Sequence, residues 1–321
     1  MRKHPSAPEG VVGVLCGGPS AEREISIRSG RAVHEALRSR GTPAVLVELS
    51  QDLQQIPEEI RRSKISCAFV VLHGPFGEDG TVQALLEQMG ILHTGSSPEA
   101  SRYAMDKVSA RRRWLAARLP VPRWVTADRY SAQSRAQEFL RFPVVVKPLA
   151  QGSSMGMSIV DHPEEMPGAL EEAVRYDEEI LLEEYLPGTE LTVGILEEAA
   201  LPIIQILPKR RFYDTVAKYT PGMCEYIVPA PLPEGMRNQI QQISLKAHET
   251  LGCRSFSRVD LILVPGRGPV LLELNTIPGM TNTSLLPKAA QAAGIDFPEL
   301  CQRMLASAFN RQELCQRGAT A

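Results

Sequence analysis

The N-terminal third of the chain alternates short apolar runs with amphipathic segments. Residues 11–16, 44–47 and 67–72 are apolar runs of strand length. Residues 25–37 and 79–89 carry apolar side chains at helical spacing, so both segments are predicted to be helices. Strands that alternate with helices predict a parallel sheet covered by helices. A ligand of such a sheet binds beyond the carboxyl ends of its strands.

The rest of the chain mixes strands and helices in a less regular order. Predicted strands cover residues 124–126, 144–149, 158–160, 180–185, 191–196, 201–207, 257–264 and 270–274. Predicted helices cover residues 97–118, 131–140, 164–175, 285–293 and 298–309. A polar segment, 208–226, is too long for an ordinary connection. Long loops inside compact proteins are usually functional lids or disordered, and this one is long enough to be a lid.

The composition is that of a globular protein close to neutrality. The 35 Lys and Arg residues against 37 Asp and Glu leave a net charge of −2, which gives no pull towards nucleic acid or anionic membranes. A hydrophobic share of 43% argues against disorder. No apolar run reaches the roughly 18 residues of a membrane span, and residues 1–10 are predicted to be a polar tail. The 6 cysteines have no zinc spacing, which favours reduced thiols in a cytoplasmic protein.

A glycine- and serine-rich loop, residues 151–156, follows the predicted strand that carries Lys147. Small residues after a strand let backbone N–H groups close over a phosphate, and the lysine adds a positive charge at the strand end. The alternative is a flexible hairpin with a solvated lysine. The loop is not a Walker loop, because the G-x-x-x-x-G-K-[ST] pattern is absent.

Asp260, Glu273 and Asn275 lie on predicted strands among apolar neighbours. Carboxylates in such surroundings are costly unless they are paired or bound to a cation. Asp, Glu and Asn offer hard oxygen ligands, which suit Mg²⁺. Glu273 and Asn275 are two positions apart and share one face of their strand. The alternative is a local salt bridge of outward-facing residues with Arg258.

The segment 278–285 is a turn that leads into a predicted helix. Gly279 allows close backbone approach, and the N–H groups of Ser284 and Leu285 could hold a carboxylate. The alternative is simple capping of the helix by Thr283 or Ser284.

These features occur within a series of motifs that together resemble the D-alanine–D-alanine ligase family of the ATP-grasp superfamily. The motifs are, in order, GGPSAEREISIRSG, HGPFGEDGTVQALLE, MDK, VVVKPLAQGSSMGMS, EEYLPGTELTV, YDTVAKYT, SRVDL and LLELNTIPGMTNTSLLP. The resemblance runs over residues 11–305. It is specific because all the motifs occur in this order.

The resemblance implies an α/β protein in which an N-terminal parallel-sheet (Rossmann-like) domain precedes a two-part ATP-grasp fold. We expect a disordered tail over residues 1–10 and a substrate-binding domain over 11–98. A central ATP-grasp domain over 99–186 and a C-terminal catalytic domain over 187–321 would grip ATP between them. The segment 208–226 would be the closing loop of the C-terminal domain.

The resemblance also implies a nucleotide site. Lys107 and Lys147 would contact the phosphates. The residues expected to complete this site are Ser153 and Ser154 at the phosphates, Glu183, Tyr185 and Leu186 around the adenine, and Glu190 at the ribose. Asp260, Glu273 and Asn275 would hold two Mg²⁺ ions, for which Mn²⁺ can substitute.

For the amino-acid substrates the resemblance implies a second set of contacts. Glu22 would pair with the ammonium of the first D-alanine, and His73 would lie near its carboxylate. The oxyanion site would consist of Arg258 and the Gly279 N–H, and the second D-alanine carboxylate would bind at Ser284 and Leu285. On the closing loop, Lys218 and Tyr219 would complete the site, with Tyr219 contacting Glu22 and Ser153.

A few positions depart from the family or have plainer interpretations. Gln151 stands where relatives often have Glu, and Thr215 and Val216 replace an aromatic and an acidic residue of the loop motif. Glu22 also fits a solvated helix start. Residues 111–113, three consecutive arginines, are predicted to form a solvated helix face.

The predicted function is the ATP-dependent joining of two D-alanine molecules through an acyl phosphate, for peptidoglycan precursors. The partners are then ATP and D-alanine in the cytoplasm, with no nucleic acid and no membrane, and a homodimer is left open. Within the superfamily, D-lactate, D-serine or another amino acid is the alternative acceptor. A nucleotide-binding module without ligase activity would gain nothing from the metal-ligand set. A dinucleotide dehydrogenase is disfavoured because residues 17–20 do not form G-x-G-x-x-G.

Overall fold

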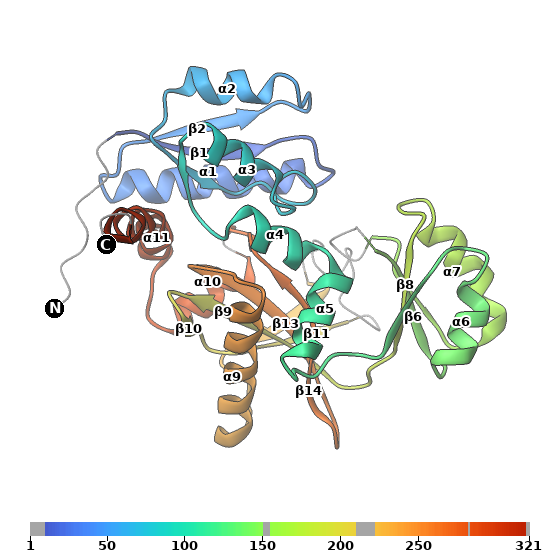
Figure 1. Cartoon of the computed structure of the whole chain (residues 1–321). Coiled ribbons are helices and arrows are strands. Elements are labelled where there is room, and N and C mark those ends of the chain that lie inside the picture. The colour runs from blue at the N-terminus through green and yellow to red at the C-terminus, as the bar shows by residue number, and fades with distance from the viewer. Residues whose placement is uncertain (1–9, 150–154, 210–221, 282, 319–321) are drawn as a thin grey trace.

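Figure 1 shows the computed structural model of the chain, which describes residues 10–149, 155–209, 222–281 and 283–318. Three sheets make up the described chain, one parallel and two antiparallel. Figure 1 places the four-stranded antiparallel sheet apart from the other two, at the right of the view. The predicted α/β class is therefore confirmed at the level of the elements.

The N-terminal sheet has the order β2-β1-β3-β4, and all its pairs are parallel. Its strands are β1 (Val12–Gly17), β2 (Ala44–Leu49), β3 (Cys67–Val70) and β4 (Leu92–His93). Its helices are α1 (Arg23–Ser39), α2 (Ile56–Ser63) and α3 (Thr81–Gln88). Prediction missed the two-residue β4 and the helix α2, which buries only Ile56 and Ile60. This sheet is the parallel sheet that the alternating pattern predicts.

Close packing of α1 on β1 depends on one glycine. A Cβ on Gly30 would lie 2.6 Å from the Cβ of Cys16. Around this contact α1 buries Ile27, Val33 and Leu37 against a strand that is buried along its whole length. The approach fixes the start of α1, and with it Glu22, beside the carboxyl end of β1.

The central sheet is antiparallel, with the order β5-β8-β6-β7. Its strands are β5 (Trp124–Ala127), β6 (Val144–Pro148), β7 (Ser158–Val160) and β8 (Ile180–Glu184). Figure 1 shows α6 (Ala132–Phe139) and α7 (Met166–Ala173) on one face of it. A short 3-10 turn, Pro163–Glu165, directly precedes α7. Val144, Val146, Met166 and Ile180 belong to the core between sheet and helices. The opposite face carries Lys147 and Glu183, which are predicted for the nucleotide site.

The C-terminal sheet is the largest, with the order β12-β11-β9-β13-β14 and β10 paired to β9. Its strands are β9 (Thr189–Leu196), β10 (Ala199–Ala200), β11 (Ile204–Pro208), β12 (Cys224–Ile227), β13 (Phe256–Val264) and β14 (Gly268–Asn275). One core joins it to α9 (Glu234–Thr250), and another to α10 (Leu285–Ala292) and α11 (Phe297–Gly318). The second core also contains α1 and β1, so the N-terminal unit and the C-terminal sheet share buried side chains.

The structure differs from the sequence prediction at two places in this region. Prediction missed α9, because Ser244 and His248 are buried on the face that carries Ile240 and interrupt its apolar pattern. The predicted loop 208–226 has paired ends: Pro208 closes β11 and faces Cys224 of β12. The part of this loop at 210–221 lies outside the described residues.

The predicted helix 97–118 consists of two helices, α4 (Pro98–Met105) and α5 (Lys107–Ala116). Asp106 separates them, because its backbone is extended while its carboxylate accepts the N–H groups of Val108 and Ser109 at 2.9 and 3.0 Å. Both helices pack on the C-terminal sheet, where Trp114 is fully buried in its core. Residues 99–118 of the predicted central domain therefore pack with the C-terminal core.

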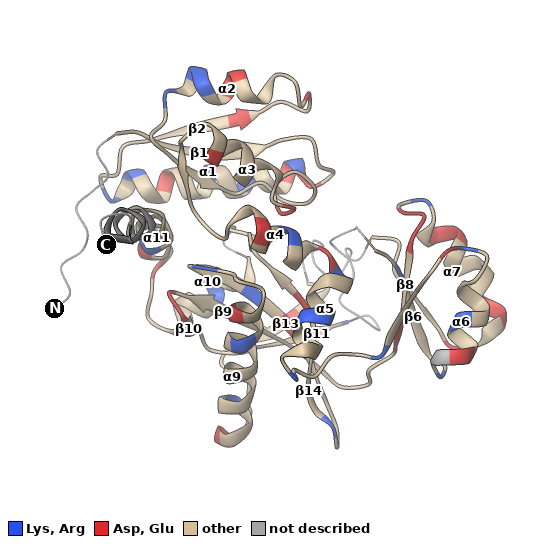
Figure 2. Cartoon of the chain, viewed as in Figure 1, with Lys and Arg blue, Asp and Glu red and all other residues tan. Residues whose placement is uncertain are grey.

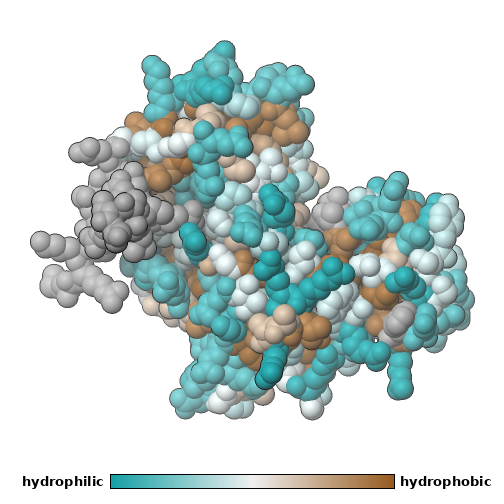
Figure 3. All heavy atoms as spheres, viewed as in Figure 1, coloured by the Kyte–Doolittle hydropathy of each residue, from teal (hydrophilic) through white to brown (hydrophobic). Residues whose placement is uncertain are grey.

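The surface agrees with the neutral composition. Figure 2 shows Lys and Arg interspersed with Asp and Glu over the described elements. Figure 3 shows that hydrophobic residues on this face form separate groups among hydrophilic ones. Within the described residues, no helix is long and apolar enough to cross a membrane.

Candidate active site

Strands β13 and β14 bring the predicted metal ligands together. Asp260 pairs with Glu273 and Arg258 with Asn275 in the antiparallel register, with a bulge directly after Asp260. The Asp260 carboxylate accepts from Arg258 Nε at 2.9 Å and Nη2 at 2.7 Å, and from Asn275 Nδ2 at 3.2 Å. Thr192 Oγ1 of β9 donates to it at 2.6 Å. The salt bridge weighed as the alternative therefore forms at the same place as the ligand cluster.

These oxygen ligands fit a hard cation that takes its remaining ligands from water or substrate. Asp260 and Glu273 supply two carboxylates and Asn275 an amide oxygen. Across the described residues, no group of three or more His, Cys, Asp or Glu side chains converges on one point. Mg²⁺ usually keeps several waters and binds one or two carboxylates together with substrate phosphates. The pair therefore suits Mg²⁺ that arrives with a nucleotide rather than a closed protein cage.

A cluster of buried charges lies where the central sheet meets α5. Glu183 of β8 is bound by two cations, with Oε1 on the Lys147 ammonium and Oε2 on Nη2 of Arg111. The side chains of Arg111, Glu183 and Lys147 are 0%, 5% and 13% exposed. The prediction of a solvated Arg111 is therefore wrong, although its neighbours Arg112 and Arg113 are exposed. A run of three arginines does not reveal which of them faces inward.

The charges of this cluster shift each other's pKa. Burial favours the neutral form of Glu183, but the adjacent Arg111 and Lys147 outweigh it and lower its pKa. The pKa of Lys107 is lowered to about 8, above all by burial; Lys147 and Arg111 act in the same direction, while Glu273 and Glu183 oppose it. The predicted phosphate-binding lysines thus share one electrostatic environment with Glu183 and with Glu273, a predicted metal ligand.

Of the predicted adenine and ribose residues, Glu183 lies in the charge cluster on β8, and the other three follow it along the chain. Leu186 is buried, Tyr185 is partly exposed, and Glu190 is the second residue of β9. Tyr185 also lines a cavity of about 470 Å³ beside the central sheet. Its lining residues are Arg123, Leu140, Arg141, Phe142, Pro143, Glu184, Tyr185 and Pro187.

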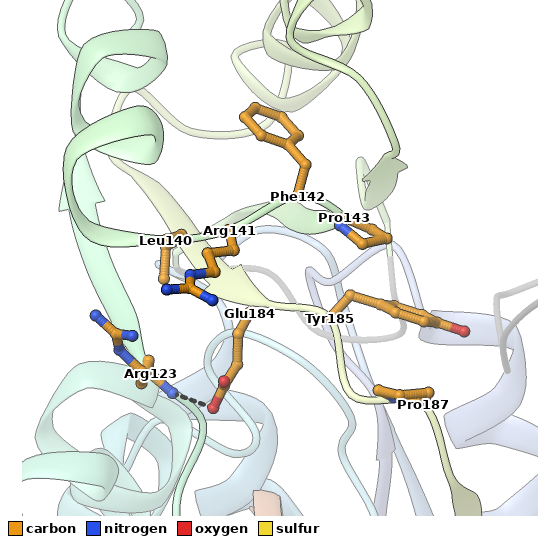
Figure 4. Close-up of a pocket in the computed structure, with 8 residues that line it drawn as sticks. All are labelled: Arg123, Leu140, Arg141, Phe142, Pro143, Glu184, Tyr185 and Pro187. Atoms are coloured by element: carbon orange, nitrogen blue, oxygen red, sulfur yellow. Dashed lines mark hydrogen bonds between the residues drawn. The ribbon is translucent and has the colours of Figure 1, made fainter.

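Figure 4 shows how this cavity is built. The Glu184 carboxylate points towards Arg123 and accepts its backbone N–H at 2.7 Å, whereas the Tyr185 ring points away from Arg123. Arg267 also donates to Glu184 at 2.7 Å. Because neighbouring strand residues alternate between faces, Glu183 points to the buried cluster and Glu184 to this outer cavity.

At the N-terminal unit, Glu22 and His73 lie beyond the carboxyl ends of β1 and β3, as a parallel sheet predicts. Glu22 lines a cavity of about 510 Å³ that also includes Ser20, Phe76 and Met155. Met155 belongs to the predicted phosphate loop, residues 151–156, so this cavity reaches the central unit. A Cβ on Gly74, whose φ is +71°, would lie 3.0 Å from Glu22 Oε2.

His73 is buried and tied to the C-terminal part of the site. Its Nε2 lies 3.4 Å from Ser29 Oγ, and Ser29 Oγ accepts the Met280 N–H at 3.3 Å. Burial lowers the pKa of His73, although Glu22 and a hydrogen bond with the Ile277 backbone act in the opposite direction. His73 and Ser29 therefore connect the N-terminal unit to the turn that carries Gly279.

Sequence reasoning missed Glu78, which lies in this same region. Its Oε2 accepts the Gly74 N–H at 2.7 Å. Burial and the negative charge of Glu22 raise its pKa to about 8, against the opposing effects of Gly74 and Arg258. The sequence signal was available, because Glu78 belongs to the same HGPFGEDG motif as His73.

The turn before α10 places Gly279, Ser284 and Leu285. A Cβ on Gly279 would lie 2.7 Å from Ser284 Oγ, so a side chain there has no room. Ser284 Oγ accepts the Thr281 N–H at 3.0 Å and makes no capping bond to α10, although Ser284 is the N-cap residue. Capping by the Ser284 hydroxyl is therefore not what holds this turn.

Several predicted residues lie outside the described part of the chain. They are Ser153 and Ser154 of the phosphate loop, Lys218 and Tyr219 of the closing loop, and the departures Gln151, Thr215 and Val216.

Comparisons with known proteins cover nearly the whole chain. Family models for the N-terminus and the C-terminus of D-ala D-ala ligase match residues 48–96 and 114–306. The D-alanine–D-alanine ligase of Geotalea uraniireducens is 47% identical over 92% of this chain and 95% of its own. That of Geobacter sulfurreducens is 47% identical over 92% of this chain and 93% of its own.

Solved structures agree with these matches. The D-alanine–D-alanine ligase from Bacillus anthracis complexed with ATP has a TM-score of 0.82 and 31% identity, covering 96% of this chain and 99% of its own. The VanG D-Ala:D-Ser ligase from Enterococcus faecalis has a TM-score of 0.80 and 26% identity, covering 94% of this chain and 100% of its own. The fold is an N-terminal parallel-sheet domain followed by an ATP-grasp pair of sheets, as predicted.

Proposed function

Because the chain belongs to the D-alanine–D-alanine ligase family, we propose that it joins two molecules of D-alanine at the expense of ATP. The product, D-alanyl-D-alanine, would serve as a peptidoglycan precursor made in the cytoplasm. The observation that carries the proposal is the in-register pair of Asp260 and Glu273 with Arg258 on the same strand face. Glu273 also raises the pKa of the buried Lys107, so this pair acts electrostatically on a predicted phosphate-binding lysine.

A carboxylate cannot acylate an amine in water without activation. ATP would supply a phosphoryl group to the first D-alanine carboxylate, which gives an acyl phosphate and ADP. Lys107 and Lys147 would bind the phosphates, because fixed cations stabilise the charge that moves onto the terminal phosphoryl oxygens. Mg²⁺ held by Asp260, Glu273 and Asn275 would neutralise phosphate charge in the same step. Glu183, Tyr185 and Leu186 would hold the base, and Glu190 the ribose.

The substrate residues would act on either side of the acyl phosphate. Glu22 would bind the ammonium of the first D-alanine, and His73, neutral because it is buried, would stay near its carboxylate. The amine of the second D-alanine then attacks the acyl carbon. Arg258 and the Gly279 N–H would stabilise the tetrahedral oxyanion, and inorganic phosphate leaves.

Ser284 and Leu285 would bind the carboxylate of the second D-alanine. Ser284 Oγ also accepts the Thr281 hydroxyl or donates to it at 2.8 Å, which orients the turn. Leu285 is the first residue of α10, and N–H groups at a helix start are free to bind an anion. The two positions therefore combine a hydroxyl with the positive end of a helix.

An alternative acceptor is D-serine, because one structural relative is named a D-Ala:D-Ser ligase. D-lactate is the other acceptor considered from the sequence. Both share a carboxylate with D-alanine, so the carboxylate contact at Ser284 and Leu285 does not distinguish them. The preference for D-alanine therefore has to be measured directly.

The deciding experiment incubates the protein with MgATP and single or paired D- and L-amino acids, and separates the products by mass. We expect ADP and inorganic phosphate in equal amounts, formed only when D-alanine is present, with D-alanyl-D-alanine as the product. AMP and pyrophosphate as products would exclude the acyl-phosphate route. In a competition from about pH 6 to 9, we expect dipeptide to increase with pH, because more of the D-alanine amine, with a pKa near 8 or above, is free. A predominance of the D-lactate or D-serine product would replace D-alanine as the acceptor.

A further inference from the structure

Arg111 is a buried cation to which neither the sequence motifs nor the proposed reaction gives a role. Its Nε and Nη1 have no hydrogen-bond partner in the described part of the chain. The ring of Trp124 lies 5.9 Å from its Cζ, which offers the charge partial compensation. Burying a guanidinium with hydrogen bonds unmade costs free energy. A hydrophobic side chain of similar volume is often at least as stabilising at such a position.

The contact that Arg111 does make leads to the nucleotide site. Its Nη2 donates to Oε2 of Glu183, while the other oxygen of Glu183 binds Lys147. The Glu183 carboxylate is thereby held from both sides, and its direction towards Lys147 is set by Arg111. Without Arg111, the carboxylate could rotate and the Lys147 ammonium would lose its fixed position.

The same contact joins two separate parts of the fold. Arg111 lies on α5, which packs on the C-terminal sheet through Trp114, whereas Glu183 and Lys147 lie on the central sheet. Figure 1 shows α5 between these two sheets. The ion pair therefore bridges the two bodies between which ATP would bind.

The bridge also acts on the second predicted phosphate-binding lysine. Glu273 and Glu183 raise the pKa of Lys107, whereas Lys147 and Arg111 lower it. Arg111 therefore acts on this lysine electrostatically, although its own side chain is fully buried.

We propose that Arg111 is a positioning residue of the nucleotide site: through Glu183 it fixes Lys147 for the phosphates of ATP. This rests on the proposed function only in that Lys147 binds the phosphates of a nucleotide. Arg111 is not expected to touch ATP. Its removal should therefore weaken the binding of ATP and ADP more than that of adenosine, which has no phosphate and keeps only the base contact predicted for Glu183.

The test measures Kd values for ATP, ADP and adenosine by calorimetry on the full chain, for wild type and Arg111→Met. We expect ATP and ADP to bind about tenfold more weakly in Arg111→Met. This factor is the lower end of the loss in affinity seen when a metal-binding side chain loses the partner that orients it. The affinity for adenosine should fall clearly less than the affinities for ATP and ADP. In steady state, KM for ATP should rise while KM for D-alanine stays constant. Arg111→Lys, which keeps one charged donor, should recover part of the ATP affinity.

Arg112→Met is the matched control, because Arg112 is the next residue of α5 and is exposed. It should bind all three ligands like wild type. Equal ATP affinity in wild type and Arg111→Met would overturn the proposal, as would an equal loss for ATP and adenosine. If Arg111→Met does not fold, Arg111→Lys decides alone: wild-type ATP affinity would overturn the proposal and a selective loss would support it. D-alanine-dependent ADP release by wild type tests the proposed function separately.

Discussion

The Arg258 guanidinium and the Asp260 carboxylate, two positions apart on β13, are joined by two hydrogen bonds of 2.9 and 2.7 Å. The residue proposed for the oxyanion is therefore held by a residue proposed for the metal. Such a bidentate ion pair fixes the direction of the guanidinium as well as its position. Metal binding at Asp260 and placement of Arg258 are for this reason expected to depend on each other.

Replacing Arg258 should affect chemistry more than binding. We expect Arg258→Ala to lower kcat by about 10²–10³, since an oxyanion donor acts only in the transition state. KM for ATP should change less than kcat. Arg254→Ala, at an exposed position just before β13, is the control. Turnover of Arg258→Ala close to that of wild type would remove Arg258 from the chemistry.

Glu273 should determine how much magnesium the enzyme needs. Chelation of Mg²⁺ should stop ADP release, and added Mg²⁺ should restore it. We expect Glu273→Gln to raise the Mg²⁺ concentration for half-maximal ADP release by at least about tenfold, since loss of even an outer partner of a metal ligand costs that much. Glu225→Gln, an exposed carboxylate on β12 of the same sheet, should behave like wild type. An unchanged Mg²⁺ dependence of Glu273→Gln would contradict the assigned ligand role.

Ser29 links the N-terminal unit to the turn that carries Gly279. Ser29→Ala removes the acceptor of the Met280 N–H and the contact with His73. We expect a loss of about 1 kcal/mol in the free energy of unfolding and a lower kcat, because the Gly279 N–H loses its fixed direction. Ser39→Ala, near the other end of α1, removes only a local bond to Ala36 and serves as the comparison. If kcat is equal in both variants, the link has no part in catalysis.

His248 should make stability depend on pH in the acid range. It is buried, its Nδ1 lies 2.7 Å from Ser257 Oγ, and burial lowers its pKa to about 4. The unfolded chain, with a pKa near 6.5, binds the proton more readily, so stability is lost as pH falls from about 6.5 to 4. The loss attributable to His248 is on the order of 3 kcal/mol.

His248→Gln carries no titrating group and should reduce this acid-dependent loss. Urea unfolding at pH 7 and pH 4.5 measures it for both proteins. His34→Gln is the control, because His34 is only partly buried on α1. The same pH dependence in wild type and His248→Gln would show that this histidine is not the group responsible.

Patterns that repeat along the chain allowed much of the fold to be predicted. Alternating runs predicted the parallel N-terminal sheet, because strand and helix periods differ and each is visible locally. Glu273 and Asn275 could be placed on one strand face from their spacing alone. Asp260 opposite Glu273 required the antiparallel register of β13 and β14, which spacing does not contain.

The sequence by itself determined most of the elements, the family resemblance and the residue types of the site. Only the tertiary structure decided which charges are buried together. Arg111, Arg112 and Arg113 are the same residue type, but Arg111 is the one that is buried and bonded to Glu183. The reason is that this position of α5 faces the central sheet. Glu78 acquires a pKa of about 8 only where the fold buries it beside Glu22. Burial and electrostatic pairing depend on neighbours from distant segments, and a linear pattern carries no information about those distances.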